Sequence, residues 1–102
     1  MIECNSIDEV RNNINNIDEQ IVKLIALRGA FVTQAAKFKK DSEDVKAPKR
    51  VEEVISKVKN IARLNGANEE VVENVYKVMI ESFIKAEMKE FENLKWKIYL
   101  FL

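Results

Sequence analysis

Apolar side chains recur at alternating steps of three and four residues along the first third of the chain, which is the spacing of one helix face. The pattern predicts a helix from Ser6 to about Lys39 or Lys40. Ser6 to Glu9 also has the sequence of a capping box, in which the hydroxyl and the carboxylate satisfy each other's backbone N–H groups. The apolar stripe comprises Ile7, Val10, Ile14, Ile17, Ile21, Leu24, Phe31, Ala35 and Phe38.

One position in this stripe carries a charge. Arg28 lies between Leu24 and Phe31, where the spacing requires an apolar residue. The helix is also long, because about 34 residues span roughly 50 Å, whereas a compact domain of this size measures roughly 26 Å across. We therefore expect a second chain to cover the far half of the helix.

Two further helices follow an acidic break. Asp41 to Pro48 is predicted to be a loop of six to eight residues, because a residue before proline avoids the helical region. Pro48 then begins a second helix, and Asn65 and Gly66 form its C-cap. Its buried face is expected to hold Val51, Val54, Ile55, Val58, Ile61 and Ala62.

Asn68 is expected to cap the third helix. Its apolar side contains Val72, Tyr76, Met79, Ile80, Phe83, Ile84 and Phe91, and Glu87 interrupts this stripe as Arg28 interrupts the first. The tail from Leu94 to Leu102 is apolar. It either continues the third helix and covers a partner subunit or forms an amphipathic surface anchor, and its sparse charge favours packing.

The composition supports a single all-α domain over residues 1–102. The 17 basic and 17 acidic residues cancel, so nothing in the net charge points to nucleic acid or a membrane as partner. The chain has no His and one cysteine, Cys4, which excludes a Ser-His-Asp system and a Cys/His zinc site. We expect no metal or other cofactor, and the polar, acidic N-terminus favours a cytoplasmic location.

The cations of the first helix suggest an anion site. Arg28 and Lys39 are 11 residues apart, which returns to nearly the same side of a helix and lets both reach one small anion. Arg11 lies about 100° away around the helix and roughly 25 Å from Arg28, so it would serve such a site only from an antiparallel second copy. The expected assembly is a homodimer with two equivalent sites.

Structural interpretations stand beside this one. Arg11 and Lys39 are also compatible with ordinary solvated positions, and Arg28 with an internal ion pair to Glu87, since a buried charge requires a partner. Arg50 lies at the start of the second helix, where anions are favoured. A salt bridge between Arg50 and Glu52, Glu53 or the acidic loop is as compatible with the spacing.

Taken together, these residues resemble the all-α (type II) chorismate mutases and the related isochorismate pyruvate lyases. The resemblance covers roughly residues 6 to 92 and rests on the order and spacing of its charged positions. The matching pieces are Val10-Arg11, Ile17 to Val22 with Leu24 and Arg28, Ala36 to Lys39, Ala47 to Val51, and Ile80 to Glu87.

The resemblance implies an intertwined homodimer of three-helix chains that rearranges chorismate to prephenate. Arg11 of the second subunit and Arg28 would hold the two carboxylates of the dianionic substrate, with Arg50 at the mouth of the site. Lys39 would donate a hydrogen bond to the ether oxygen and to a carboxylate. Glu87 would donate to the same ether oxygen, but only when protonated, and the sequence leaves its protonation state open.

Two departures from the mutase pattern leave other activities open. Many mutases carry acidic residues where this chain has Ala47 and Val51, and the sequence here is more similar to the lyases, which convert isochorismate to salicylate and pyruvate. A third interpretation is a non-catalytic helical dimerisation module in which Arg28 and Glu87 neutralise each other.

Overall fold

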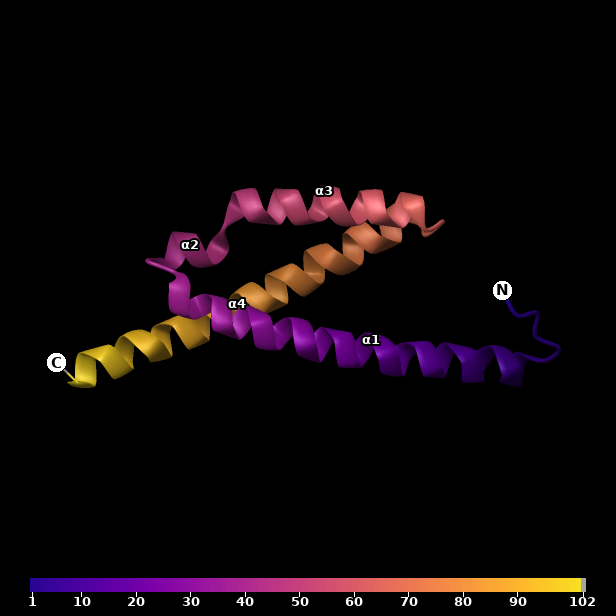
Figure 1. Ribbon diagram of the computed structural model, residues 1–102, viewed down its shortest axis with the longest axis horizontal. Helices are drawn as coiled ribbons and strands as arrows, with labels where there is room; N and C mark the ends of the chain where they lie inside the picture. Colours follow the sequence, from indigo (N-terminus) through magenta and orange to yellow (C-terminus); the bar gives the residue numbers. More distant parts are fainter. Residues whose placement is uncertain (102) are drawn as a thin grey trace. The chain divides into compact units, whose positions relative to one another are not determined.

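The computed structural model describes residues 1–101, and within that range it is built from helices without strands (Figure 1). The elements are α1 (Ile7–Ala35), the 3-10 helix η1 (Ala36–Phe38), α2 (Ser42–Lys46), α3 (Pro48–Leu64) and α4 (Glu69–Phe101). The all-α class and the three principal helices, α1, α3 and α4, are as predicted. The last tail residue, Leu102, lies outside the described residues.

The chain divides into two compact units, Met1–Phe31 and the part that begins at Val32. In the first unit, α1 begins one residue after the predicted cap. The Ser6 hydroxyl accepts a hydrogen bond from the backbone N–H of Glu9 at 3.1 Å, as expected. The Glu9 carboxylate accepts from the backbone N–H of Asn5 at 2.9 Å. The Glu9 carboxylate therefore binds the N–H of the residue before Ser6, and not the N–H of Ser6 that the capping box predicts.

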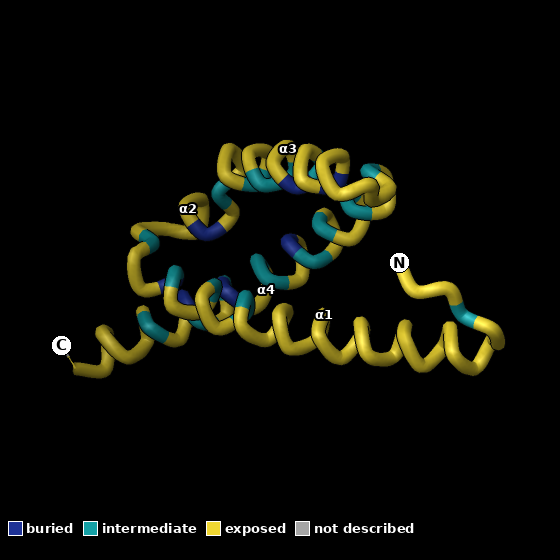
Figure 2. The backbone as a smooth tube through the Cα atoms, turned by 45° about the vertical axis from the view of Figure 1, so that its right-hand side comes forward, coloured by how far each residue is buried: buried dark blue, intermediate teal, exposed yellow. Residues whose placement is uncertain are grey.

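The apolar stripe of α1 is exposed in the single chain (Figure 2). No residue of α1 is buried, although the helix contains 29 residues. Ile14 is 49% exposed, Leu24 65% and Phe31 62%. A row of large apolar side chains of this length is typical of a surface that another protein covers.

The end of α1 differs from the prediction. The helix stops at Ala35, and the backbone continues as η1. Lys39 follows η1 in an extended conformation (φ −87°, ψ 138°). The 11-residue argument that placed Arg28 and Lys39 on one side of one helix is therefore wrong, because Lys39 does not belong to that helix.

The predicted loop from Asp41 to Pro48 contains the short helix α2, which is a second correction. The side chain of Asp41 caps α2 by accepting a hydrogen bond from the backbone N–H of Asp44. Val45 anchors α2 because it is only 2% exposed. Ala47 separates α2 from α3 in the left-handed region (φ 39°, ψ 61°), so the residue before the proline does leave the right-handed helix.

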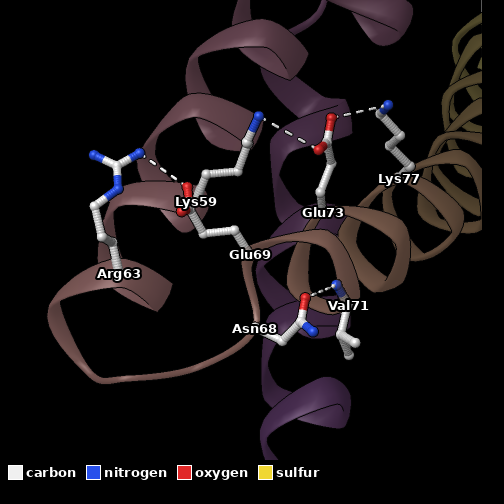
Figure 3. A network of polar contacts seen from close by, with 7 residues as sticks. All are labelled: Lys59, Arg63, Asn68, Glu69, Val71, Glu73 and Lys77. Carbon is white, nitrogen blue, oxygen red and sulfur yellow. Dashed lines mark hydrogen bonds and ion pairs between the residues drawn. The ribbon is translucent and has the colours of Figure 1, made fainter.

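The turn between α3 and α4 has the predicted caps. Gly66 adopts a φ of 68°, where L side chains are disfavoured. The backbone N–H of Ala67 donates to the carbonyl of Ala62 at 2.8 Å, which completes a Schellman motif. The side chain of Asn68 accepts from the N–H of Val71 at 3.1 Å and caps α4 (Figure 3).

Ion pairs join α3 and α4 beside this turn (Figure 3). Lys59 lies 3.4 Å from Glu73, and Arg63 lies 2.9 Å from Glu69. Both pairs connect the two helices, so they fix how α4 leaves the turn. Glu73 also contacts Lys77 on its own helix at 3.0 Å.

The core of the second unit is formed where η1 and α2 meet α4. Ala36, Val45 and Phe91 are buried together, with Ile84, Met88 and Leu94 packed against them. Val58, Ala62 and Ile80 are buried along α3 and α4, as the sequence predicts. Ile61 was expected to be buried but is 45% exposed. None of the described helices has both the length and the apolar character of a membrane span.

Candidate functional site

Glu87 is a buried charged residue in the middle of α4. Its neighbours on the same side of the helix, one turn before and after, are Ile84 and Phe91. Only 6% of the residue is exposed. The sequence identified this position because Glu87 interrupts an apolar stripe, and the structure confirms that the carboxyl group lies in the buried stripe.

Lys39 extends toward this carboxyl group. Its Nζ lies 3.7 Å from Oε2 of Glu87, which is an ion pair that is too long for a hydrogen bond. The same nitrogen donates a hydrogen bond to the backbone carbonyl of Asp44 at 3.0 Å. The Lys39 side chain is 24% exposed, so the pair lies at the edge of the core.

The segment that positions Lys39 was missed by the sequence interpretation. The Asp44 carboxylate accepts a hydrogen bond from the backbone N–H of Lys40 at 3.0 Å, while its carbonyl holds the Lys39 ammonium group. Asp41 caps the same helix, α2. The signal was present, because Asp41 and Asp44 have the spacing of an N-cap and the third residue of a helix. The sequence pattern instead predicts a loop, because the segment is rich in acidic residues.

The pKa of the Glu87 carboxyl is raised above its ordinary value. Burial is the larger cause, since it disfavours the charged form, and the nearby Lys39 ammonium opposes it. The structure thus indicates the direction that the sequence left open. Within residues 1–101, Oε2 of Glu87 is buried and has no hydrogen-bond partner. Burying a polar atom without a hydrogen bond costs free energy, so this site favours a ligand that forms the missing hydrogen bond.

The pair is arranged to bind a single acceptor atom. Hydrogen bonds to oxygen have lengths of about 2.8 Å, so one ligand oxygen can contact two groups that are 3.7 Å apart. Lys39 would supply a charged donor, and protonated Glu87 would supply a neutral one. Such a pair stabilises negative charge that develops on the bound oxygen.

Arg50 is not directed at this pair. It lies in the first turn of α3 and is exposed, and its guanidinium group lies 3.8 Å from the carboxylate of Glu53. The salt bridge considered from the sequence is therefore present. A role for Arg50 in ligand binding stays a prediction that requires its side chain to turn away from Glu53.

Arg11 and Arg28 both lie on α1, in the unit that ends at Phe31. Arg11 is exposed in the second turn, and Arg28 is partly buried near the end of the helix. Their contribution to the site stays a prediction, as does the alternative ion pair between Arg28 and Glu87. The structure brings together Lys39 and Glu87 from the predicted set, because both belong to the second unit.

Comparison with known proteins gives a second, independent line of evidence about this chain. The family model for chorismate mutase type II matches residues 10–88, a range that includes all five predicted site residues. An isochorismate pyruvate lyase from Pseudomonas aeruginosa is 28% identical over 87 residues, which cover 85% of this chain and 86% of that protein. A bifunctional chorismate mutase/prephenate dehydratase from Buchnera aphidicola subsp. Schizaphis graminum is 28% identical over 86 residues, or 83% of this chain and 22% of that protein.

Proposed function

Because the chain belongs to the chorismate mutase type II family, we propose that it converts chorismate to prephenate. The observation that carries this proposal is the Lys39–Glu87 pair, in which a buried carboxyl oxygen without a hydrogen-bond partner in the described chain lies 3.7 Å from an ammonium group. This arrangement fits a substrate whose reacting atom is an oxygen. The ether oxygen of chorismate would occupy the position between the two donors.

The rearrangement breaks the ether C–O bond while a new C–C bond forms, and negative charge grows on the oxygen. The protein then needs no nucleophile, which suits a chain without His. Lys39 would stabilise the growing charge directly, and protonated Glu87 would donate a hydrogen bond to the same atom. Holding the substrate in its folded conformation supplies the remainder of the rate acceleration.

The substrate also carries two carboxylates. Arg28 would bind one of them, and Arg11 of a second copy would bind the other, since guanidinium groups pair with carboxylates through two parallel hydrogen bonds. Arg50 would assist at the mouth of the site after leaving Glu53. These assignments follow the resemblance noted from the sequence and the charge of the substrate.

The proposed enzyme is a homodimer that forms through α1. Ile14, Ile21 and Leu24, which all belong to the stripe, are 49%, 47% and 65% exposed. An antiparallel pair of α1 helices would bury these residues against each other. It would also place Arg11 of each copy near the other copy's site. Within one chain, Arg11 lies too far along α1 from Arg28 to contact the same small ligand.

Isochorismate pyruvate lyase activity is the second candidate. Two observations favour it: the acidic residues of many mutases are replaced here by Ala47 and Val51, and the lyase relative is matched over 86% of its length. The same cations would expel pyruvate from isochorismate and leave salicylate. Lys39 and Glu87 would again act on the oxygen of the breaking ether bond.

A product assay distinguishes these functions. The purified chain is given chorismate and isochorismate in separate reactions, and products are separated by chromatography. We expect prephenate from chorismate. Salicylate with pyruvate from isochorismate, without prephenate, would assign the lyase activity instead. If neither substrate is converted, the chain is a non-catalytic helical module and the proposal is wrong.

A further inference from the structure

The last turns of α4 form one wall of an apolar groove that adjoins the proposed site at Lys39. The groove has a volume of about 740 Å³ and runs between α4 and the segment that follows α1. Phe91, Leu94, Trp96 and Tyr99 line it. Trp96 is 63% exposed and Tyr99 71% exposed, so the single chain leaves much of this aromatic surface uncovered. Most of the lining lies beyond residue 88, where the family match ends.

Basic side chains surround this groove. Lys37, Lys39 and Lys40 contribute from the segment after α1, and Lys95 contributes from α4. Glu92 is the one acidic side chain among the described residues that line it. A groove with an apolar floor and a positive rim favours an occupant that is both apolar and acidic.

The N-terminal segment of the chain has that composition. Glu3 is acidic, Asp8 and Glu9 follow it in the first turn of α1, and no basic side chain precedes Arg11. Ile2 is 80% exposed and is an apolar side chain of the kind that the groove would bury. The segment before α1 is not helical, so it can follow the shape of a groove.

The dimer proposed above brings these two surfaces together. In an antiparallel pair, Arg11 of one copy must lie at or beyond Arg28 of the other to share its ligand. The second copy's α1 begins at Ile7, four residues before Arg11, so its first turn lies at or beyond Val32, and the residues before it can extend further along the chain toward Ala36. Ala36 and the residues that follow it line the groove. The first residues of the second copy are therefore within reach of the groove.

We propose that the groove between α4 and residues 36–40 binds the N-terminal segment, residues 2–6, of a second copy of this chain. The inference rests on the proposed dimer and deepens it, because each segment would fasten the two subunits together beside the site. Ile2 would enter the aromatic part of the groove. Glu3 would lie near the lysines of its rim.

Cross-linking through the single natural cysteine tests this contact. A chain with Lys95→Cys and Cys4→Ser is co-expressed with the native chain under a different tag, so that a bismaleimide reagent joins one cysteine from each copy. The matched control places the new cysteine on the exposed face of α3, as Lys57→Cys with Cys4→Ser. We expect a covalent heterodimer from the first pair, with Cys4 joined to position 95, and only background from the control.

Charge reversal gives an independent measurement. We expect Lys95→Glu to raise the dissociation constant of the dimer by on the order of thirtyfold, because about 1 kcal/mol is lost from a peripheral ion pair at each of the two equivalent grooves. Adding Glu3→Lys should restore the affinity. The measurement is sedimentation equilibrium at low and at high salt, because the loss should shrink as salt screens the charges.

Three outcomes would overturn the inference. These are cross-linking at the control level, a Lys95→Glu dimer of unchanged affinity, or co-sedimentation of the native chain with anionic phospholipid vesicles that Lys95→Glu abolishes. The last would identify the groove as a lipid-binding surface. None of these outcomes removes the proposed activity, which the product assay of the native chain decides separately.

Discussion

Nζ of Lys39 lies 3.7 Å from Oε2 of Glu87, with Lys39 just after η1 and Glu87 in the middle of α4. The contact joins an ammonium group at the edge of the core to a carboxyl group inside it. It exists because the Asp44 carbonyl holds the ammonium group at 3.0 Å, which directs Lys39 across the segment toward α4. The proposed reaction depends on this relationship.

Replacing Lys39 should affect turnover far more than folding. We expect Lys39→Ala to lower kcat by about 10²–10³, the usual effect of removing one donor to a developing oxyanion. The melting temperature should also fall, because the variant loses the hydrogen bond to the Asp44 carbonyl and the ion pair with Glu87, but the folded dimer should persist. Lys85→Ala is the matched control, since Lys85 lies two residues from Glu87 with a side chain that is 77% exposed. Equal losses of turnover in both variants would show that Lys39 has no special role.

Glu87→Gln should stabilise the chain at neutral pH. The folded-state pKa of Glu87 is raised, so the folded chain binds more protons than the unfolded chain at pH values just above 4.5. Stability therefore falls as pH rises through this window, and the cost persists at pH 7. Glutamine carries no charge and avoids that cost. We expect Glu87→Gln to raise the free energy of unfolding at pH 7 by on the order of 0.5–2 kcal/mol.

Urea unfolding at several pH values measures this difference. The advantage of Glu87→Gln should be absent below pH 4 and reach a plateau at neutral pH. An advantage that is the same at all pH values would show that burial of the charge is not its cause.

The sequence predicted the parts of this fold that depend on local signals. Gly66, Asn68 and Pro48 lie at the helix boundaries that their chemistry favours, because each satisfies or removes a backbone group at a helix end. Glu87 was identified for a similar reason, since a charge in an apolar stripe is visible without a structure.

The end of α1 was not predictable in the same way. Ala36 to Lys39 are residues that tolerate a helix, so propensity favours continuing it. Contacts with α2 end it instead: Lys40 donates its N–H to the Asp44 carboxylate, and Lys39 donates to the Asp44 carbonyl. The 11-residue spacing of Arg28 and Lys39 failed for this reason, although Lys39 itself does reach Glu87.

Ala47 is a site of backbone strain. Its φ of 39° lies in the left-handed region, which costs an L residue with a Cβ roughly 1–2 kcal/mol. Ala47→Gly should remove this cost and, after the larger entropy of the unfolded glycine chain, stabilise the protein by about 0.5–1 kcal/mol. Thermal unfolding measures the change. Ala67→Gly is the control, and it should destabilise, because Ala67 has no positive φ to relieve.

A site shared between subunits should show complementation. Arg11→Ala and Lys39→Ala chains are expected to be nearly inactive alone. In a mixed dimer, one site would combine Lys39 of the first chain with Arg11 of the second and would be intact. Random exchange of equal amounts should restore roughly a quarter of the native activity. If the mixture contains mixed dimers but is no more active than the separate variants, Arg11 acts within its own chain or has no role in the site.

The pH dependence of kcat tests the central claim most directly, that protonated Glu87 donates to the ether oxygen beside Lys39. The native chain and Glu87→Gln are compared from pH 4 to pH 9 with chorismate, after dimer content is confirmed at each pH. The native activity should fall as pH rises through the raised pKa of Glu87, whereas the Glu87→Gln profile should stay flat, because the amide donates at every pH. A flat native profile, or a Glu87→Gln profile with the same fall, would contradict the claim.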